Sequence, residues 1–378
     1  MLAAMILAIF TVFSAGSMTH GFVSYYTASK LLVSGELGPL AYDDRWFGEA
    51  VQRLTASSVR EIFIPNPPPM ALMALPLAGL DAMTARTAWL IASLILFIAG
   101  VAALANYQAR RNRDLSIPVI LLIMLAPAVF TNLRIGQGYL LVFALFAATA
   151  VLLLDGRDRL AGVCLGALLA LKTSGVAMVL LLIARRRWSA LAAAFITAAA
   201  LAIAMTPFID RQMWLVYPSQ VRAYVARPAS SVTAYQTTLS LFRRLCVADP
   251  QWNPSPAADC APIAFVMPSL IVGAATIASM VLAARAKRAE PWIAVGAVLS
   301  VLSLPAVAEP HFVLMAIPLA LLRLSVLEFA VIAALLIVPL EFTAERFTTG
   351  WAVFLAYPRL YAAWLLCAAS LREVRAEC

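Results

Sequence analysis

The sequence predicts an all-α, polytopic membrane protein, and three observations lead to this fold class. Of the 378 residues, 63% are hydrophobic and only 12% are charged, whereas about a quarter of the residues in a soluble domain are charged. The mean hydropathy is +0.90. The apolar residues form runs close to the ~20 residues that a spanning helix needs, and backbone in hydrocarbon has to satisfy its own hydrogen bonds. We therefore expect about 10–12 transmembrane helices in one integral membrane domain over residues 1–378.

Lysine and arginine residues cluster between the apolar runs, and these clusters set the predicted orientation. The clusters are Arg110 to Arg113, Arg157 with Arg159, Arg185 to Arg187, Arg285 to Arg288 and Arg372 with Arg375. Such clusters mark the cytoplasmic side of a membrane protein. Orientation and contact with membrane lipids thus explain the net charge of +9, and no nucleic-acid partner is expected. The first run, Met1 to Ser17, lacks the basic start and cleavage site of a signal peptide, so we expect a retained first span.

The first long polar interval, residues 18–69, is the loop around which the predicted architecture is organised. A cytoplasmic N-terminus places this loop on the outer face. It carries acidic, basic and tyrosine residues and closes on the sequence Pro65-Asn66-Pro67-Pro68-Pro69. The next run, Met70 to Leu80, is about half a membrane long. It either enters the membrane and returns or joins the next span through a tight turn.

The following runs continue the predicted alternation across the membrane. We expect spans at about Arg86 to Tyr107, Ser116 to Thr131 and Tyr139 to Leu154. The segment Asn132 to Gly138 is then an outer turn, on the same face as the first loop.

The run from Leu160 to Ile183 is about one span long, but arginine clusters flank both of its ends. A single helix would place one of these clusters outside, against the positive-inside rule. We therefore predict two shorter helices that meet at Lys172-Thr173-Ser174-Gly175 and direct Lys172 toward the outer half of the membrane. A lysine within a membrane is energetically expensive and usually functional.

The second half of the sequence repeats this alternation. A span from Ser189 to Thr206 leads to a second long outer loop, residues 207–261. Cys246 and Cys260 share this loop and could form a disulfide if it is extracytoplasmic, and the sequence leaves this pairing open. Further spans are expected at Pro262 to Ala284, Trp292 to Ala306, a short return ending at Arg323, Glu328 to Leu340 and Trp351 to Leu371. Glu309-Pro310-His311 is then a third outer element and Glu341 to Thr349 an outer turn, with the C-terminus in the cytoplasm.

The three polar outer elements and Lys172 together supply carboxylates, an imidazole and fixed cations. Cations stabilise a departing phosphate, and a carboxylate or imidazole can deprotonate an acceptor hydroxyl. This combination suits a substrate made of a lipid phosphate and a polar group to be transferred.

The order of several short motifs resembles glycosyltransferase family 87. The motifs are Phe22 to Ser29 with Leu31, Leu32 and Gly35, then Pro65 to Pro69 ahead of Ala71-Leu72, Gly136-Gln137, Leu160-Ala161-Gly162, Leu165-Gly166, Leu171-Lys172 and Arg185 to Trp188. Weaker matches follow at Tyr235 to Leu239 and at Glu309 to His311. The resemblance implies a C-type, multi-span glycosyltransferase fold and a polyprenyl-phosphate sugar as donor, typically of mannose.

One departure from the family pattern concerns the expected base. Family members usually carry an aspartate directly before the phenylalanine of the first-loop motif, and here that position is Gly21. The base is then expected at Asp43 or Asp44, less favourably at Glu36, or at His20, since histidine is a base near neutral pH. The structural interpretation of Asp43-Asp44-Arg45 is a solvated turn or the N-cap of an interfacial helix from Phe47 to Leu54.

The resemblance also implies roles for the other candidate residues. Lys172 would bind the lipid phosphate with help from Arg134 or His311, Gln137 would bond sugar or phosphate, and Tyr25 and Tyr26 would stack on the substrate. The aromatic belt of membrane proteins is the alternative explanation for the tyrosines. No cofactor is expected: the sequence has two histidines, which lie far apart and suggest no metal set, although the C-type fold works with or without a divalent ion.

The sequence therefore predicts a membrane glycosyltransferase in the cytoplasmic (bacterial inner) membrane. It would move a hexosyl unit, expected to be mannosyl, from a polyprenyl-phosphate donor to a lipid or cell-envelope glycan acceptor on the extracytoplasmic face. The alternatives are a transporter or lipid flippase with Lys172 at its substrate site, and an inactive family member that acts as a scaffold, which the Gly21 departure keeps open.

Overall fold

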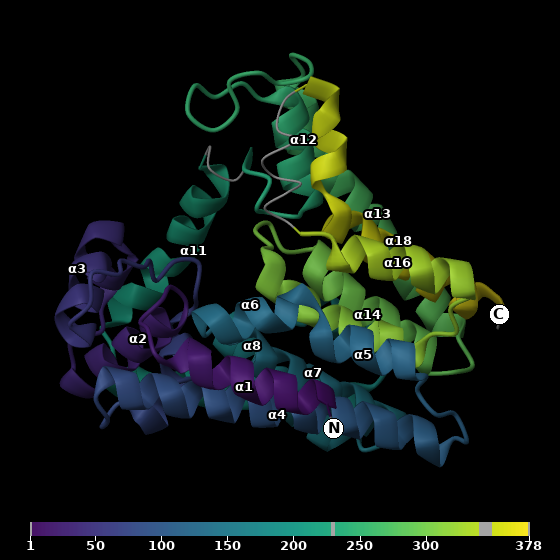
Figure 1. The fold of residues 1–378 in the computed structure, drawn as a ribbon, viewed down its shortest axis with the longest axis horizontal. Coiled ribbons are helices and arrows are strands. Elements are labelled where there is room, and N and C mark those ends of the chain that lie inside the picture. The colour runs from purple at the N-terminus through teal and green to yellow at the C-terminus, as the bar shows by residue number, and fades with distance from the viewer. Residues whose placement is uncertain (1, 228–230, 340–349, 377–378) are drawn as a thin grey trace. The chain divides into compact units, whose positions relative to one another are not determined.

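A computed structural model describes residues 2–227, 231–339 and 350–376 (Figure 1). Helix makes up 76% of the structure, and this described part of the chain contains no strand, which confirms the all-α class. The chain divides into two compact units that are interleaved in sequence. Unit 1 comprises Met1–Ala103, Val129–Ser174 and Ser189–Tyr224, and unit 2 comprises Leu104–Ala128, Gly175–Trp188 and Val225–Cys378. The single membrane domain expected over residues 1–378 stays a prediction.

Four helical segments are long and apolar enough to cross a membrane, or five if a bent pair counts as one span. They are Ala82–Arg110, Ile117–Ile135, Trp188–Phe208 and Ala261–Arg285, with Gly350–Ala356 and Pro358–Ala376 as the pair, bent by 62°. The shorter apolar helices are Leu2–Ala15, Tyr139–Leu154, Glu290–Leu302, Glu309–Leu321 and Val326–Ile337. The polytopic class is confirmed, but the expected 10–12 spans become four or five full-length ones among the described residues, because several apolar runs are short or interrupted.

Unit 1 holds most of the N-terminal half of the chain. Its elements are α1 (Leu2–Ala15), α2 (Phe22–Ser34), η1 (Pro39–Tyr42), α3 (Asp44–Thr55), η2 (Pro68–Leu72), η3 (Leu75–Leu77), most of α4 (Ala82–Arg110), α6 (Pro127–Ile135), α7 (Tyr139–Leu154), α8 (Asp158–Lys172), α10 (Trp188–Met205) and most of α11 (Arg211–Ala226). The run Met70 to Leu80 thus forms two short 3-10 helices. The apolar run Tyr139 to Leu154 forms the helix α7, which is one of the shorter apolar helices, so its crossing of the membrane stays a prediction.

The core of unit 1 joins the first polar loop to α11. One buried cluster contains Phe22 and Tyr25 of α2, Phe47 of α3, Met213 of α11 and also Phe63, which lies between α3 and η2. In Figure 1, α2, α3 and α11 gather at one side of the unit. Aromatic side chains bury large apolar areas, so the first loop is a packed part of the unit. It is therefore a fixed platform for its polar residues.

Two helix boundaries in unit 1 follow from local chemistry. The Asp43 side chain accepts a hydrogen bond of 2.7 Å from the Trp46 amide at the start of α3, which confirms the predicted N-cap. The helix α8 ends at Lys172, where Thr173 has φ +49° and Gly175 has φ +93°, and α9 (Val176–Ala184) begins directly after. The predicted break at Lys172 to Gly175 is confirmed.

Small residues let α8 approach α10 closely. A Cβ atom added to Gly162 would lie 2.2 Å from the Ala190 carbonyl oxygen, and one added to Gly166 would lie 2.4 Å from that of Ala194. Both helices thus present a small residue every fourth position, the spacing that favours close helix contact in membranes.

Unit 2 is built around α14. Its elements are α5 (Ile117–Leu125), α9, α12 (Thr238–Cys246), α13 (Ala261–Arg285), α14 (Glu290–Leu302), η6 (Glu309–Met315), α15 (Ala316–Leu321), α16 (Val326–Ile337), η7 (Gly350–Ala356) and α18 (Pro358–Ala376). Every residue of α14 is buried, because this helix packs against both α9 and α18. The helix α16 also packs on α18 (Figure 1). The predicted outer turn Glu341 to Thr349 falls outside the described residues.

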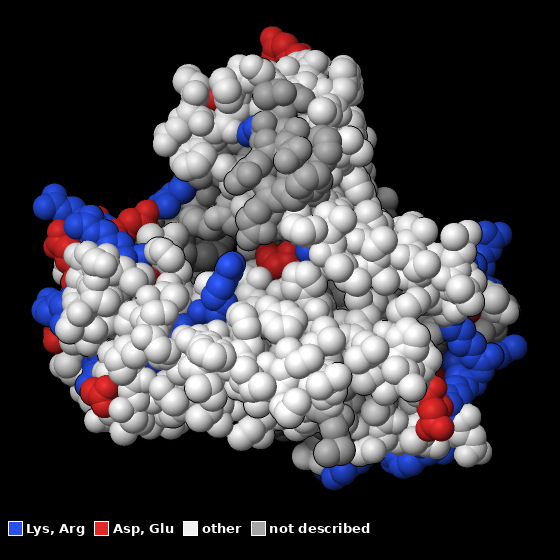
Figure 2. Space-filling view, in the orientation of Figure 1, with Lys and Arg blue, Asp and Glu red and all other residues white. Residues whose placement is uncertain are grey.

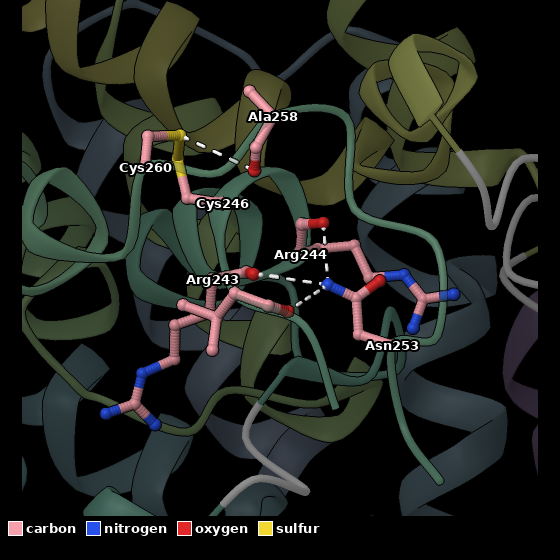
Figure 3. The surroundings of a disulfide bond; sticks show 7 residues. Arg243, Arg244, Cys246, Asn253, Ala258 and Cys260 are labelled. Atoms are coloured by element: carbon pink, nitrogen blue, oxygen red, sulfur yellow. Dashed lines mark hydrogen bonds between the residues drawn. A yellow bond between two sulfur atoms is a disulfide. The ribbon is translucent and has the colours of Figure 1, made fainter. Parts of the chain in front are cut away.

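Two strong tertiary links stabilise unit 2. Cys246 and Cys260 form a disulfide, beside Asn253, whose side-chain amide donates a 2.9 Å hydrogen bond to the Arg244 carbonyl (Figure 3). The fully buried Arg359 donates to both carboxylate oxygens of Glu309, at 3.1 and 2.9 Å. Removing one partner of such a buried pair is strongly destabilising, so Glu309 has a structural role.

Candidate functional site

Lys172 presents its charge beside two aromatic rings in unit 1. The Nζ atom lies 4.8 Å from the ring centroid of Tyr25 and 5.2 Å from that of Tyr139. It also donates a 2.8 Å hydrogen bond to the Oδ1 atom of Asn66. The side chain is half-buried, and within the part of the chain that the structure describes no carboxylate forms an ion pair with it. An ammonium group has three donor hydrogens, so Lys172 retains capacity for an anion.

Asn66 is fixed by two further hydrogen bonds that involve side chains. Its Nδ2 atom donates to the Phe63 carbonyl at 2.6 Å, and its own carbonyl accepts from the Tyr42 hydroxyl at 3.1 Å. Burial is the main cause that raises the pKa of Tyr42, so this hydroxyl stays a donor at neutral pH. Asn66 is a residue that sequence reasoning missed, because an asparagine between prolines reads as part of a turn.

Tyr25 and Gln137 are bonded directly to each other. The Tyr25 hydroxyl donates to Gln137 Oε1 at 2.6 Å and accepts from the Gly138 amide at 3.2 Å. Its ring stacks on Trp89 with 5.2 Å between centroids, and the Trp89 indole donates to the Gly136 carbonyl at 2.9 Å. The segment Asn132 to Gly138 is therefore held against α2 and α4, and Lys172, Tyr25 and Gln137 form one continuous group.

A buried arginine fixes the same segment from behind. Arg86 is fully buried and donates to the carbonyl oxygens of Ser14 at 2.9 Å and Arg134 at 2.8 Å. The Thr19 hydroxyl bonds the same Arg134 carbonyl at 3.2 Å. The Arg134 side chain itself is exposed, so this segment offers a second cation to an anionic substrate.

The environment of Gly21 explains why it is not an aspartate. Its φ is +87°, and an added Cβ would lie 2.7 Å from the Ile135 carbonyl oxygen and 3.0 Å from Gln137 Nε2. Left-handed backbone favours glycine, and the contact leaves no room for a side chain. Gly21 therefore places backbone directly against Gln137.

A carboxylate reaches Gly21 from elsewhere in the loop. Glu61 Oε2 accepts a 2.9 Å hydrogen bond from the Gly21 amide, and Glu61 Oε1 accepts one of 3.0 Å from the Ile62 amide. His20 Nδ1 lies 3.6 Å from the same Oε2, with 69% of the His20 side chain exposed and 19% of that of Glu61. Sequence reasoning missed Glu61, since nothing in the local pattern pairs it with a residue 40 positions earlier.

The remaining first-loop candidates lie in other contacts. Asp43 caps α3, and Asp44 is the first residue of that helix. Glu36 forms an ion pair of 3.1 Å with Arg53, both largely exposed. The Tyr26 hydroxyl donates to the Leu80 carbonyl at 2.8 Å, so it closes the loop onto the start of α4. The structure thus joins Tyr25, Gln137 and Lys172 through direct contacts. His20 lies beside Glu61, which bonds the Gly21 amide. Asp43, Asp44, Glu36 and Tyr26 have the other contacts described above.

His311 belongs to unit 2, in η6, where its Nδ1 lies 3.1 Å from the Ala308 carbonyl oxygen. Among the described residues, no group of three or more His, Cys, Asp or Glu side chains could hold a metal ion. Within unit 1, the Lys172 ammonium and the exposed Arg134 guanidinium, three residues before Gln137, are cations that can stabilise a phosphate.

Comparison with known proteins identifies a family. The sequence model described as glycosyltransferase family 87 matches residues 63–305, which is more than half of the chain and includes Asn66, Gln137 and Lys172. No curated protein matches the chain.

Proposed function

Since the chain belongs to glycosyltransferase family 87, we propose that it transfers a hexosyl unit, specifically a mannosyl unit, from a polyprenyl-phosphate donor. The acceptor is a lipid or a cell-envelope glycan at the extracytoplasmic face of the cytoplasmic membrane. Family membership supports a multi-pass membrane glycosyltransferase. The donor, the sugar, the acceptor and the membrane face are the parts that we propose.

The observation that carries the proposal is the uncompensated charge of Lys172. A half-buried cation without a carboxylate partner is unfavourable unless an anion binds it. The rings of Tyr25 and Tyr139 and the side-chain Oδ1 atom of Asn66 hold the ammonium in place. A lipid phosphate is an anion that reaches such a site from within the membrane. Gln137 and Arg134, on the adjacent segment, bind the sugar or the remaining phosphate oxygens.

The proposed reaction is a displacement at the anomeric carbon of the donor sugar. The acceptor hydroxyl oxygen forms the new bond to this carbon while the bond from the carbon to the phosphate oxygen breaks. Polyprenyl phosphate leaves with the electron pair, and Lys172 stabilises its growing negative charge. The proton of the acceptor hydroxyl passes to a base. No metal is assigned a role.

His20 is the base that the geometry favours, with Glu61 as its positioning residue. The two backbone amides that bond Glu61 fix its carboxylate, and the carboxylate faces His20 Nδ1. When Nδ1 carries the proton, Nε2 has the free electron pair and can accept a proton. The largely exposed His20 ring is accessible to an acceptor, whereas Asp43 is engaged as a helix cap.

The donor is tested by offering purified, reconstituted wild type a panel of radiolabelled donors with a crude lipid acceptor fraction. The panel contains polyprenyl-phosphate mannose, polyprenyl-phosphate glucose and the matching nucleotide sugars. We expect label to appear in acceptor from a polyprenyl-phosphate sugar and not from a nucleotide sugar. Failure of every polyprenyl donor with folded protein would refute the proposal and favour a transporter, flippase or scaffold.

The base is tested with His20→Ala, Glu61→Gln and the double variant, with Glu49→Gln as the control for loss of an exposed carboxylate. We expect kcat to fall by about 10²–10⁴-fold in each single variant at unchanged donor KM. The double variant should be no slower than the slower single variant, because the two residues act as one unit. Added imidazole should partly restore His20→Ala, which a purely structural role would not allow. Full turnover by His20→Ala would instead return the role of base to Asp43 or Asp44.

A further inference from the structure

We propose that unit 2 carries a specific site for an anionic glycerophospholipid, independent of the sugar-transfer site. The site is a cavity of about 610 Å³ between the end of α4, the start of α5, the end of α15 and the start of α16. Ligand pockets commonly have volumes of about 300–1,000 Å³, so the cavity accommodates a phosphate headgroup, the glycerol and the first part of the acyl chains.

The polar side of the cavity has an excess of positive charge. Arg113 and Arg323 line it, and Asp114 is the acidic residue that lines it. Neither arginine side chain forms an ion pair among the residues that the structure describes. Outside the cavity lining, Glu328 pairs with Arg372, and Glu373 accepts from the Arg323 backbone amide and shares its electrostatic interaction among Arg288, Arg323 and Arg372. Two guanidinium groups against one carboxylate favour an anionic ligand.

Other residues that line the cavity are apolar, and exposed apolar residues of α5 and α16 adjoin them. Val119 and Phe329 line the cavity, and Val326 at its edge is 88% exposed. Beside it, Ile117 is 72% exposed. Figure 2 shows Lys and Arg atoms gathered near the C-terminus and the connection from α4 to α5, while the surface over α5 is white. A polar pocket that opens onto exposed apolar helix surface suits a lipid, with its headgroup at the arginines and its chains along α5 and α16.

The start of α5 supports the same polarity. Ser116 caps this helix without a side-chain hydrogen bond and lines the cavity. The first backbone amides of a helix lack partners within the helix and favour negative charge. These amides add to the two arginines but would not define a site by themselves. Basic pockets between membrane helices are known to bind anionic headgroups.

The test is native mass spectrometry of the purified chain in equal amounts of phosphatidylglycerol and phosphatidylcholine with identical acyl chains. We expect wild type to retain phosphatidylglycerol preferentially. Arg113→Gln and Arg323→Gln should each reduce this preference by about fivefold, and Asp114→Asn should raise it by about fivefold. A gain of binding cannot result from misfolding, so Asp114→Asn keeps the test decisive if an arginine variant folds poorly.

The matched control removes two exposed arginines outside the cavity, Arg285→Gln with Arg375→Gln. This variant should keep the preference within about twofold. An excess of glycerol phosphate, which has the charge without the chains, should not displace the lipid. The proposal is refuted if wild type shows no preference, if the control loses it as fully as Arg113→Gln with Arg323→Gln, or if glycerol phosphate displaces the lipid. None of these readouts depends on sugar transfer.

Discussion

The Nζ atom of Lys172 lies 2.8 Å from the Oδ1 atom of Asn66, which ties the last residue of α8 to the proline-rich end of the first loop. Because Asn66 accepts this hydrogen bond without carrying charge, the lysine is positioned but not neutralised. Its charge remains available to an anionic substrate.

Replacing Asn66 tests this distinction between positioning and neutralisation. Asn66→Ala should lower kcat/KM for the donor by about 10- to 100-fold, since a hydrogen bond to a charged group contributes about 1.5–3 kcal/mol. Asn66→Asp should place a carboxylate on Lys172 and raise the donor KM, because it competes with the phosphate. Steady-state kinetics with varied donor measures both. An Asn66→Asp variant with tighter donor binding would show that Lys172 does not bind phosphate.

Gly21 should not tolerate the aspartate that is usual in the family. Gly21→Ala and Gly35→Ala both place a side chain at positive φ, +87° and +73° respectively, but an added Cβ has no neighbour within 4 Å at Gly35. Left-handed backbone costs a residue other than glycine roughly 1–2 kcal/mol. We expect Gly35→Ala to lower Tm modestly, and Gly21→Ala and Gly21→Asp to lower it further. An Asp variant that is stable and faster than wild type would contradict this structure of the loop.

The α8–α10 contact should be sensitive to side-chain volume. Gly166→Leu would insert four carbons at a position where even a single added Cβ would lie 2.4 Å from the Ala194 carbonyl oxygen. Gly273, in α13, has open space around it, so Gly273→Leu is the matched control. Overpacking costs typically about 1–3 kcal/mol, and thermal unfolding in detergent should show a loss for Gly166→Leu alone. Equal Tm values for the two variants would mean that α8 and α10 do not pack closely.

The disulfide should stabilise the second long loop. Cys246→Ser with Cys260→Ser opens a link between residues 14 positions apart, and a loop of this size corresponds to about 3 kcal/mol of unfolding free energy. We expect a lower Tm, and the same loss on reduction of wild type, whereas Cys164→Ser should change little because Cys164 is a free thiol. Free thiols at Cys246 and Cys260 in mature wild type, detected by alkylation and mass spectrometry, would contradict the link.

The sequence predicted the features of the site that follow from hydropathy and charge. The arginine clusters around Leu160 to Ile183 required a break, and α8 indeed ends at Lys172. An N-cap at Asp43 or Asp44 was one of the structural interpretations of these residues, and Asp43 caps α3. The bond between Tyr25 and Gln137 joins two motifs that were each identified as candidates, although their contact was not foreseen.

The partners of these residues could not be predicted, because they depend on tertiary contacts between distant segments. Glu61 is one of several acidic residues in the first loop. It is distinguished by its hydrogen bond from the Gly21 amide, which the sequence does not reveal. Asn66 reads as a turn residue until α8 brings Lys172 beside it. Four or five segments of the described chain are long enough to span a membrane and further apolar runs form shorter helices, a difference that hydropathy alone does not reveal.

The most direct test of the central claim compares transfer of radiolabelled mannose from polyprenyl phosphate by wild type, Lys172→Ala and Lys30→Ala. Lys30 is the matched control, since it also lies over a tyrosine ring in unit 1, 5.6 Å from the centroid of Tyr26. We predict that Lys172→Ala lowers transfer by at least about 10²-fold, as expected for a group that stabilises the departing charge, while Lys30→Ala stays close to wild type. Wild-type rates in a folded Lys172→Ala variant would contradict phosphate binding by Lys172.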